Sequence, residues 1–132
     1  MNVMSTIAQT ATNLRAVADE ATKLARVDSD SWTPSHTERL LRLGSAASEA
    51  ATGVTQLKSV NFTGKYASVV HDVFQGGEET ARGLTWKAQS TGTTVAVSGR
   101  SAISYGDLRA LAERATPLAD SMQAIRNLVY RP

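Results

Sequence analysis

Apolar residues recur at alternating intervals of three and four positions in three long segments of this chain. The segments cover about residues 3–26, 35–59 and 104–130. This spacing places the apolar side chains on one stripe of an α-helix. The stripe of the first segment consists of Val3, Ile7, Thr10, Leu14, Val17, Ala21 and Leu24. The pattern therefore predicts three amphipathic helices.

Short polar stretches indicate where these helices begin and end. Residues 28–31 contain two aspartates and two serines, and Pro34 follows them, so the first helix should end before this cluster. Ser35 and Glu38 have the spacing of a capping box, which predicts that the second helix begins at Ser35. Pro117 lies inside the last segment and predicts a kink, because proline removes one backbone hydrogen bond.

A fourth helix is expected over residues 64–82. Its helically spaced apolar and aromatic residues are Tyr66, Val69, Val70, Val73 and Phe74. Gly83 is a favourable residue for ending a helix. The glycine pair at positions 76 and 77 interrupts or ends this helix.

Residues 84–98 have a different character, because they are rich in β-branched residues and contain Trp86. Ser90, Thr91 and Gly92 form a turn-like sequence between two such runs. This pattern predicts a β-hairpin. The alternative is that the preceding helix continues to about residue 90, with Leu84 and Ala88 on its stripe.

Together these elements predict a mainly α fold. We expect a single helical domain over residues 1–132, built as an antiparallel bundle of about four helices with the hairpin inserted before the last helix. Gly44, Ala47 and Ala51 form a strip of small residues on the second helix. A glycine inside a helix costs about 1 kcal/mol relative to alanine, so another backbone is expected to lie close to this strip.

Composition changes this picture in one respect. Aromatic residues make up only 5% of the chain, so leucine, valine, isoleucine and alanine must fill the core. Alanine has little apolar area to bury, and burial contributes only about 25 cal/mol per Å². A protein partner, in a homo-oligomer or a larger assembly, is therefore expected to supply the missing burial.

Net charge and cysteine content limit the partners and the kinds of site that this chain can have. The formal net charge of +2 is too small to indicate a nucleic acid or an anionic membrane as the partner. The chain has no cysteine, which excludes disulfides, thiolate metal sites and cysteine nucleophiles. No stretch approaches the roughly 18 apolar residues that a transmembrane helix needs, and no signal-peptide pattern is seen. We expect a virion or cytoplasmic location.

No group of residues in the sequence indicates catalysis, a cofactor or a metal. His36 lacks the further ligands that a zinc site needs. Asp28 and Asp30 have no third acidic partner nearby. There is neither a phosphate-binding glycine loop nor a nucleophile elbow. The sequence therefore predicts a protein that is not an enzyme and that has no cofactor and no metal site.

His71 supports an alternative. The segment with His71 and Asp72 among valines, followed by Phe74, resembles the phospho-acceptor helix of some sensor histidine kinases, and residues 125–132 resemble the end of their second dimerisation helix. The resemblance implies a phosphorelay module in which the His71 imidazole accepts a phosphoryl group and the neighbouring carboxylate orients the ring. A second alternative is a DNA-binding accessory protein that contacts phosphates through Lys87, Arg100, Arg109 and Arg114.

The leading hypothesis is a structural or assembly protein that works as an oligomer subunit, with a component of a virion or phage particle as its concrete form. Trp86 on a projecting hairpin is a candidate interface anchor, because large aromatic side chains often fill a pocket on a partner. The candidate interface residues are Trp86, Val95, Val97, Gly44, Ala47 and Ala51.

Overall fold

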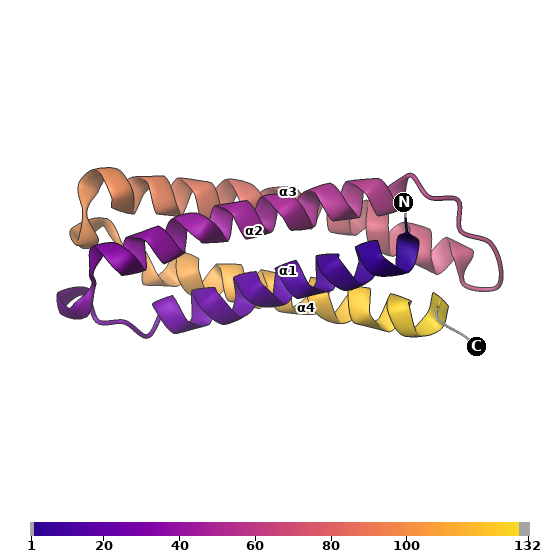
Figure 1. Cartoon of the computed structure of the whole chain (residues 1–132), viewed down its shortest axis with the longest axis horizontal. Helices are drawn as coiled ribbons and strands as arrows, with labels where there is room; N and C mark the ends of the chain where they lie inside the picture. Colours follow the sequence, from indigo (N-terminus) through magenta and orange to yellow (C-terminus); the bar gives the residue numbers. More distant parts are fainter. Residues whose placement is uncertain (1, 130–132) are drawn as a thin grey trace.

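Four long helices pack side by side in an elongated bundle in the computed structural model, which describes residues 2–129 (Figure 1). The helices are α1 (Val3–Leu24), α2 (Pro34–Lys58), α3 (Ala67–Ser98) and α4 (Tyr105–Val129). Two short 3₁₀ helices, η1 (Ser29–Ser31) and η2 (Arg100–Ala102), lie in the connections. Consecutive helices run antiparallel, and α1 begins and α4 ends at the same end of the bundle as the α2–α3 connection (Figure 1). The predicted mainly α bundle of four helices is confirmed.

The core runs along the whole bundle and receives side chains from all four helices. Helix α1 packs against α2 and α4, and α3 packs along α2, whereas α3 and α4 contact each other less extensively. The largest fully buried side chains are Phe74, Ile7, Leu14, Leu24, Leu40, Leu57, Leu84, Leu108, Leu111, Met122, Val17 and Val54. None of the helices in residues 2–129 is long and apolar enough to cross a membrane.

Helix α2 begins one residue before the position that the capping pattern predicts. Thr33 is its N-cap, and the Thr33 backbone N–H donates a hydrogen bond of 2.9 Å to Nδ1 of His36. Pro34 occupies the first helical position, where the missing N–H of proline has no helical partner to lose. The prediction that Ser35 caps this helix is therefore wrong, and His36 contributes to the cap.

Residues 84–98 form the C-terminal part of α3, so the predicted β-hairpin is wrong, as is the end of this helix at Gly83. Leu84, Ala88 and Val95 are buried at helical spacing on the inner side of α3. The hydroxyls of Thr85 and Thr94 donate to the carbonyl oxygens four residues earlier, at 3.0 and 2.8 Å. The β-propensity of threonine and valine depends on packing context, and here the helical stripe against the core outweighs it.

The glycines of α2 and α3 allow these two helices to approach closely. A Cβ atom on Gly92 would lie 3.2 Å from Cδ2 and 3.5 Å from Cα of Leu41. A Cβ atom on Gly44 would lie 3.7 Å from Cα of Gln89. The expectation that another backbone lies close to Gly44 is therefore confirmed. The glycine of the turn-like sequence at residues 90–92 thus lies inside a helix, where it provides room for Leu41 of α2.

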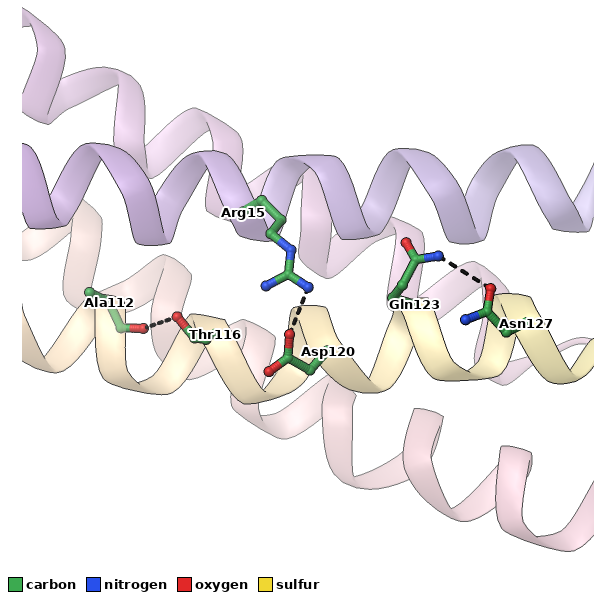
Figure 2. A network of polar contacts seen from close by, with 6 residues as sticks. All are labelled: Arg15, Ala112, Thr116, Asp120, Gln123 and Asn127. Atoms are coloured by element: carbon green, nitrogen blue, oxygen red, sulfur yellow. Dashed lines mark hydrogen bonds and ion pairs between the residues drawn. The ribbon is translucent and has the colours of Figure 1, made fainter.

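Helix α4 continues through Pro117 rather than ending there. The hydroxyl of Thr116, directly before the proline, donates to the carbonyl oxygen of Ala112 one turn back at 2.9 Å (Figure 2). The kink expected at Pro117 stays a prediction.

Ion pairs connect the helices on the outside of the bundle. Arg15 of α1 reaches across to Asp120 of α4 at 2.6 Å (Figure 2). Arg39 of α2 pairs with Glu20 of α1, and this hydrogen bond raises the pKa of Arg39. Both pairs connect α1 with a helix next to it in the bundle.

Candidate functional site

Two of the large apolar side chains of this protein are almost fully exposed on one helix. Val97 is 80% exposed and Trp86 is 72% exposed, and both lie on α3. They are eleven residues apart, which is close to three whole turns of an α-helix. The two side chains therefore project from the same side of α3, about 16 Å apart along its axis.

Ser90 and Thr93 lie between Trp86 and Val97 on the same side of the helix, and both are exposed. No residue between Lys87 and Arg100 carries a charge. We call the surface formed by Trp86, Ser90, Thr93 and Val97 the α3 face. It is an uncharged surface about three turns long, with a large apolar side chain at each end.

Leu41 of α2 lies beside α3 but outside the α3 face, because Gly92, which it contacts, points about 120° away from Trp86 around the helix. The Leu41 side chain is 44% exposed and packs against Gly92 on the flank of α3. Beneath the face, Ala88 and Val95 are buried in the core and hold this part of α3 in place. Trp86 and Val97 are thus presented by a rigid, well-packed helix.

The structure separates the candidate interface residues into two groups. Trp86 and Val97 are exposed on the α3 face. Val95 is 2% exposed, Ala47 and Gly44 are buried between α2 and its neighbours, and Ala51 is partly buried against the core. The second group packs inside the chain itself, and only the first is accessible to a partner.

Sequence reasoning missed Ser90 and Thr93. Positions 86, 90, 93 and 97 have the three-and-four spacing of a helical stripe, so this signal is present in the sequence. The interpretation of residues 84–98 as a hairpin concealed it.

His71 is exposed on the N-terminal part of α3, next to the exposed Asp72. Adjacent residues on a helix point about 100° apart, so their side chains do not face each other. No hydrogen bond or ion pair among residues 2–129 involves either side chain. The described part of the chain therefore does not place a carboxylate where it would orient this imidazole.

The basic residues considered for DNA binding lie on α3, on η2 and on α4. Lys87 forms an ion pair with Asp107 of α4 at 3.4 Å, and Arg100 donates to the Asp30 carbonyl oxygen at 3.4 Å. Arg109 and Arg114 are exposed on α4. Since Lys87 already has an acidic partner, this set does not form a uniformly positive surface.

The loop with Asp28 and Asp30 lies beside Tyr105 of α4. The Tyr105 hydroxyl donates a hydrogen bond of 2.6 Å to the Val27 carbonyl oxygen. Burial, followed by the charges of Asp28 and Asp30, raises the pKa of Tyr105. No cluster of three or more histidine, aspartate or glutamate side chains suited to a metal occurs in the part of the chain that the structure describes.

Several surface grooves could admit a small molecule. One of about 420 Å³ is lined by Asp28, Asp30 and Tyr105 beside the connection between α1 and α2. Two others lie away from the candidate site residues singled out in the sequence. One, of about 450 Å³, lies between α1 and α2, and hydroxyl and amide side chains form most of its lining together with the carboxylate of Glu49. The other, of about 620 Å³, lies at the end of the bundle where α1 begins and α4 ends, and Phe62, Tyr66 and Leu128 contribute to its walls. Neither groove contains the histidines or the aspartates singled out in the sequence.

Comparisons of the chain with known protein families, with curated proteins and with solved structures find no match. The function is therefore inferred from the surface of the bundle itself.

Proposed function

We propose that this protein is a non-enzymatic structural or assembly protein that works as a subunit of an oligomer. Its concrete setting is a virion or phage particle, in which one subunit interface is repeated many times. The α3 face is the surface through which the subunit binds its neighbours.

The 72% exposure of Trp86 carries this proposal. An indole exposed to this extent offers apolar area that a partner could cover. Tryptophan is also the residue type most enriched among those that dominate the energy of protein interfaces. Trp86 has uncharged Ser90 and Thr93 beside it on the same face, so a partner could cover the indole without burying an unpaired charge.

The small side chains in the core of the bundle support the same proposal. Many buried positions are alanines, which contribute little apolar area to the folded chain. They are Ala11, Ala18, Ala21, Ala47, Ala50, Ala81, Ala88, Ala115 and Ala119. Association through Trp86 and Val97 would add apolar burial that the isolated chain does not have.

The phosphorelay and DNA-binding alternatives receive less support. His71 has no carboxylate oriented toward it within the described residues, and Lys87 is paired with Asp107. The α3 face, in contrast, has no role within the chain that would explain its exposed indole.

The proposal is tested by measuring molar mass in solution. Light scattering or sedimentation at increasing concentration should show that the native chain forms a defined oligomer, larger than its own 14.0 kDa. Trp86→Asp should reduce the association constant at least tenfold, because it replaces the largest apolar side chain of the face with a charge. Its helical circular dichroism should remain that of the native protein, since residue 86 is exposed.

Val69→Asp is the matched control. It also introduces a carboxylate at an exposed apolar position of α3, where Val69 is 56% exposed, but it lies outside the α3 face. This variant should associate like the native protein. A strictly monomeric native chain at high concentration would overturn the proposal, as would equal association of the two aspartate variants.

A further inference from the structure

We propose that the groove between α1 and α2 is a binding site for a small hydroxylated ammonium compound, such as an amino sugar or an amino alcohol. The groove is separate from the α3 face, so this inference does not depend on the assembly function proposed above. It assigns a role to the buried hydroxyl of Thr10 and to the carboxylate of Glu49.

Two facing stripes of polar residues form the walls of this groove of about 450 Å³. Residues 5, 6, 9, 10 and 13 line it from α1, and residues 48, 49, 52, 53 and 56 line it from α2. Eight of these ten residues carry a hydroxyl or an amide group, and none is aromatic or basic. The lining therefore suits a ligand with many hydrogen-bonding groups, and it offers neither an aromatic surface for stacking nor a positive charge for an anion.

The side chains of the two walls do not hydrogen-bond to each other across the groove within residues 2–129. The Gln9 amide donates to the Asn13 side-chain oxygen on the same helix at 3.2 Å. The hydroxyls of Thr6 and Thr52 donate to the carbonyl oxygens four residues earlier, at 2.9 and 3.1 Å. These bonds leave the hydroxyl oxygens and the side-chain oxygen of Gln9 able to accept from a ligand.

Thr10 contributes a buried hydroxyl to the inner wall of the groove. Its side chain lines the groove although the residue is only 1% exposed. The hydroxyl oxygen lies over Gly53 of α2, in the space that a Cβ atom there would take, and it makes no hydrogen bond to another group in the described part of the chain. Buried polar groups are normally paired, so a ligand that bonds to this hydroxyl supplies the partner that the chain does not.

Glu49 carries the one charge among the residues that line the groove. It precedes Gly53 by one turn on the same side of α2, about 6 Å along the helix axis. Its carboxylate forms no ion pair within residues 2–129, whereas Glu20, Glu38 and Glu78 each pair with a basic side chain. A carboxylate available in this way favours an ammonium group, which would bind it through a charge-assisted hydrogen bond.

The site can be tested by titrating the native chain with three probes and following its backbone amide shifts by nuclear magnetic resonance. Glucosamine at about pH 6, where such an amine is protonated, has both the charge and the hydroxyls. Glucose has the hydroxyls without the charge, and propylammonium chloride has the charge without the hydroxyls. Glucosamine should shift the amides of residues 5–13 and 48–56 and should bind about tenfold more tightly than either of the other probes.

Two pairs of variants connect this binding to the named groups. Glu49→Gln should weaken glucosamine binding about tenfold, and its matched control Glu79→Gln, at an exposed carboxylate of α3, should bind like the native chain. Thr10→Ala should weaken binding about threefold, whereas Thr10→Ser, which keeps the hydroxyl, should retain it.

Several outcomes would overturn the inference without affecting the assembly function. They are an absence of glucosamine binding, shifts confined to other parts of the bundle, and equal binding by Glu49→Gln and the native chain. Glucose that binds as tightly as glucosamine would show a site for neutral sugars, and propylammonium that binds as tightly would show a site for simple amines. Trp86→Asp, in contrast, should leave glucosamine binding unchanged, because residue 86 does not line the groove.

Discussion

The hydroxyl group of Thr10 on α1 occupies the space that a Cβ atom on Gly53 of α2 would need. Thr10 is 1% exposed and Gly53 is buried, so this contact lies between the two helices, beside the groove that both residues line. The close approach of α1 and α2 therefore depends on the glycine.

We expect Gly53→Ala to destabilise the fold by about 1–3 kcal/mol, because the added methyl group overpacks a tight contact. The double variant Thr10→Ala with Gly53→Ala should regain most of this loss, since removing the hydroxyl makes room for the methyl group. Chemical denaturation of the single and double variants gives the coupling free energy between the two positions.

Gly76→Ala is the matched control for Gly53→Ala. Gly76 also lies inside a helix, but nothing is within 4 Å of the position that its Cβ would take. This variant should be more stable than the native protein by about 0.5–1 kcal/mol, because alanine is the better helix former. Equal effects of the two alanine substitutions would contradict the importance of the Thr10 contact.

Tyr105 should make stability depend on pH in the alkaline range. Its pKa is raised, so the folded state favours the neutral phenol that donates to the Val27 carbonyl oxygen. This contribution is fully present below the unfolded tyrosine pKa of about 10 and is lost as the pH rises through the higher folded value. We expect Tyr105→Phe to be less stable than the native protein by about 0.5–1.5 kcal/mol at pH 7.

The difference between the two proteins should shrink and then reverse as Tyr105 ionises. Urea denaturation at neutral pH and at pH values above 10 measures it. The other tyrosines are common to both proteins, so their titration cancels. A difference that does not change with pH would argue against the raised pKa.

The two ion pairs of α1 should differ in their contribution to stability. In the pair between Arg15 and Asp120 the side chains are 44% and 62% exposed, so water and salt screen it, and Asp120→Asn should cost less than about 0.5 kcal/mol. In the pair between Arg39 and Glu20 they are 35% and 27% exposed, so Glu20→Gln should cost more, about 1 kcal/mol. Thermal denaturation of both variants at low and high salt compares the pairs. A larger loss for Asp120→Asn would contradict this ranking.

Trp86 should report association through its fluorescence. Trp32→Phe leaves it as the only tryptophan of the chain, since there are two. Emission from an indole that is 72% exposed should shift to shorter wavelength, and acrylamide quenching should weaken, as concentration rises and the α3 face is covered. In the matched variant Trp86→Phe, the emission of Trp32, which is 7% exposed, should not change with concentration. A Trp86 spectrum that is independent of concentration in an oligomer would show that the face stays open.

We expect no acid-labile phosphate on His71 after incubation with acetyl phosphate. The reason is that Asp72, one residue further along the helix, points about 100° away from the imidazole and cannot orient it. Mass spectrometry under alkaline conditions tests this, with His71→Gln as the control. A phosphoryl group that is present in the native chain and absent from the variant would favour the phosphorelay module over the assembly protein.

Three of the helices were predictable from the sequence, because their buried residues follow one uninterrupted stripe. Helices α1, α2 and α4 begin and end within about two residues of the predicted bounds. Pro34 at the start of α2 and the short polar stretches between the helices are residues that local chemistry assigns to helix starts, caps and loops. The sequence predicted Ser35 rather than Thr33 as the cap of α2. Both residue types make good caps, so only the backbone conformation distinguishes the two positions.

The sequence by itself determined that the chain forms amphipathic helices and that its core is poor in aromatic side chains. Only the tertiary structure decided that residues 84–98 are helical, because threonine and valine suit a strand unless Leu84, Ala88 and Val95 have a core to pack against. The same packing places Gly92 close to Leu41, where the sequence alone indicated a turn. Once the segment is helical, Trp86 and Val97 share one exposed side, so the α3 face exists only as a consequence of the bundle.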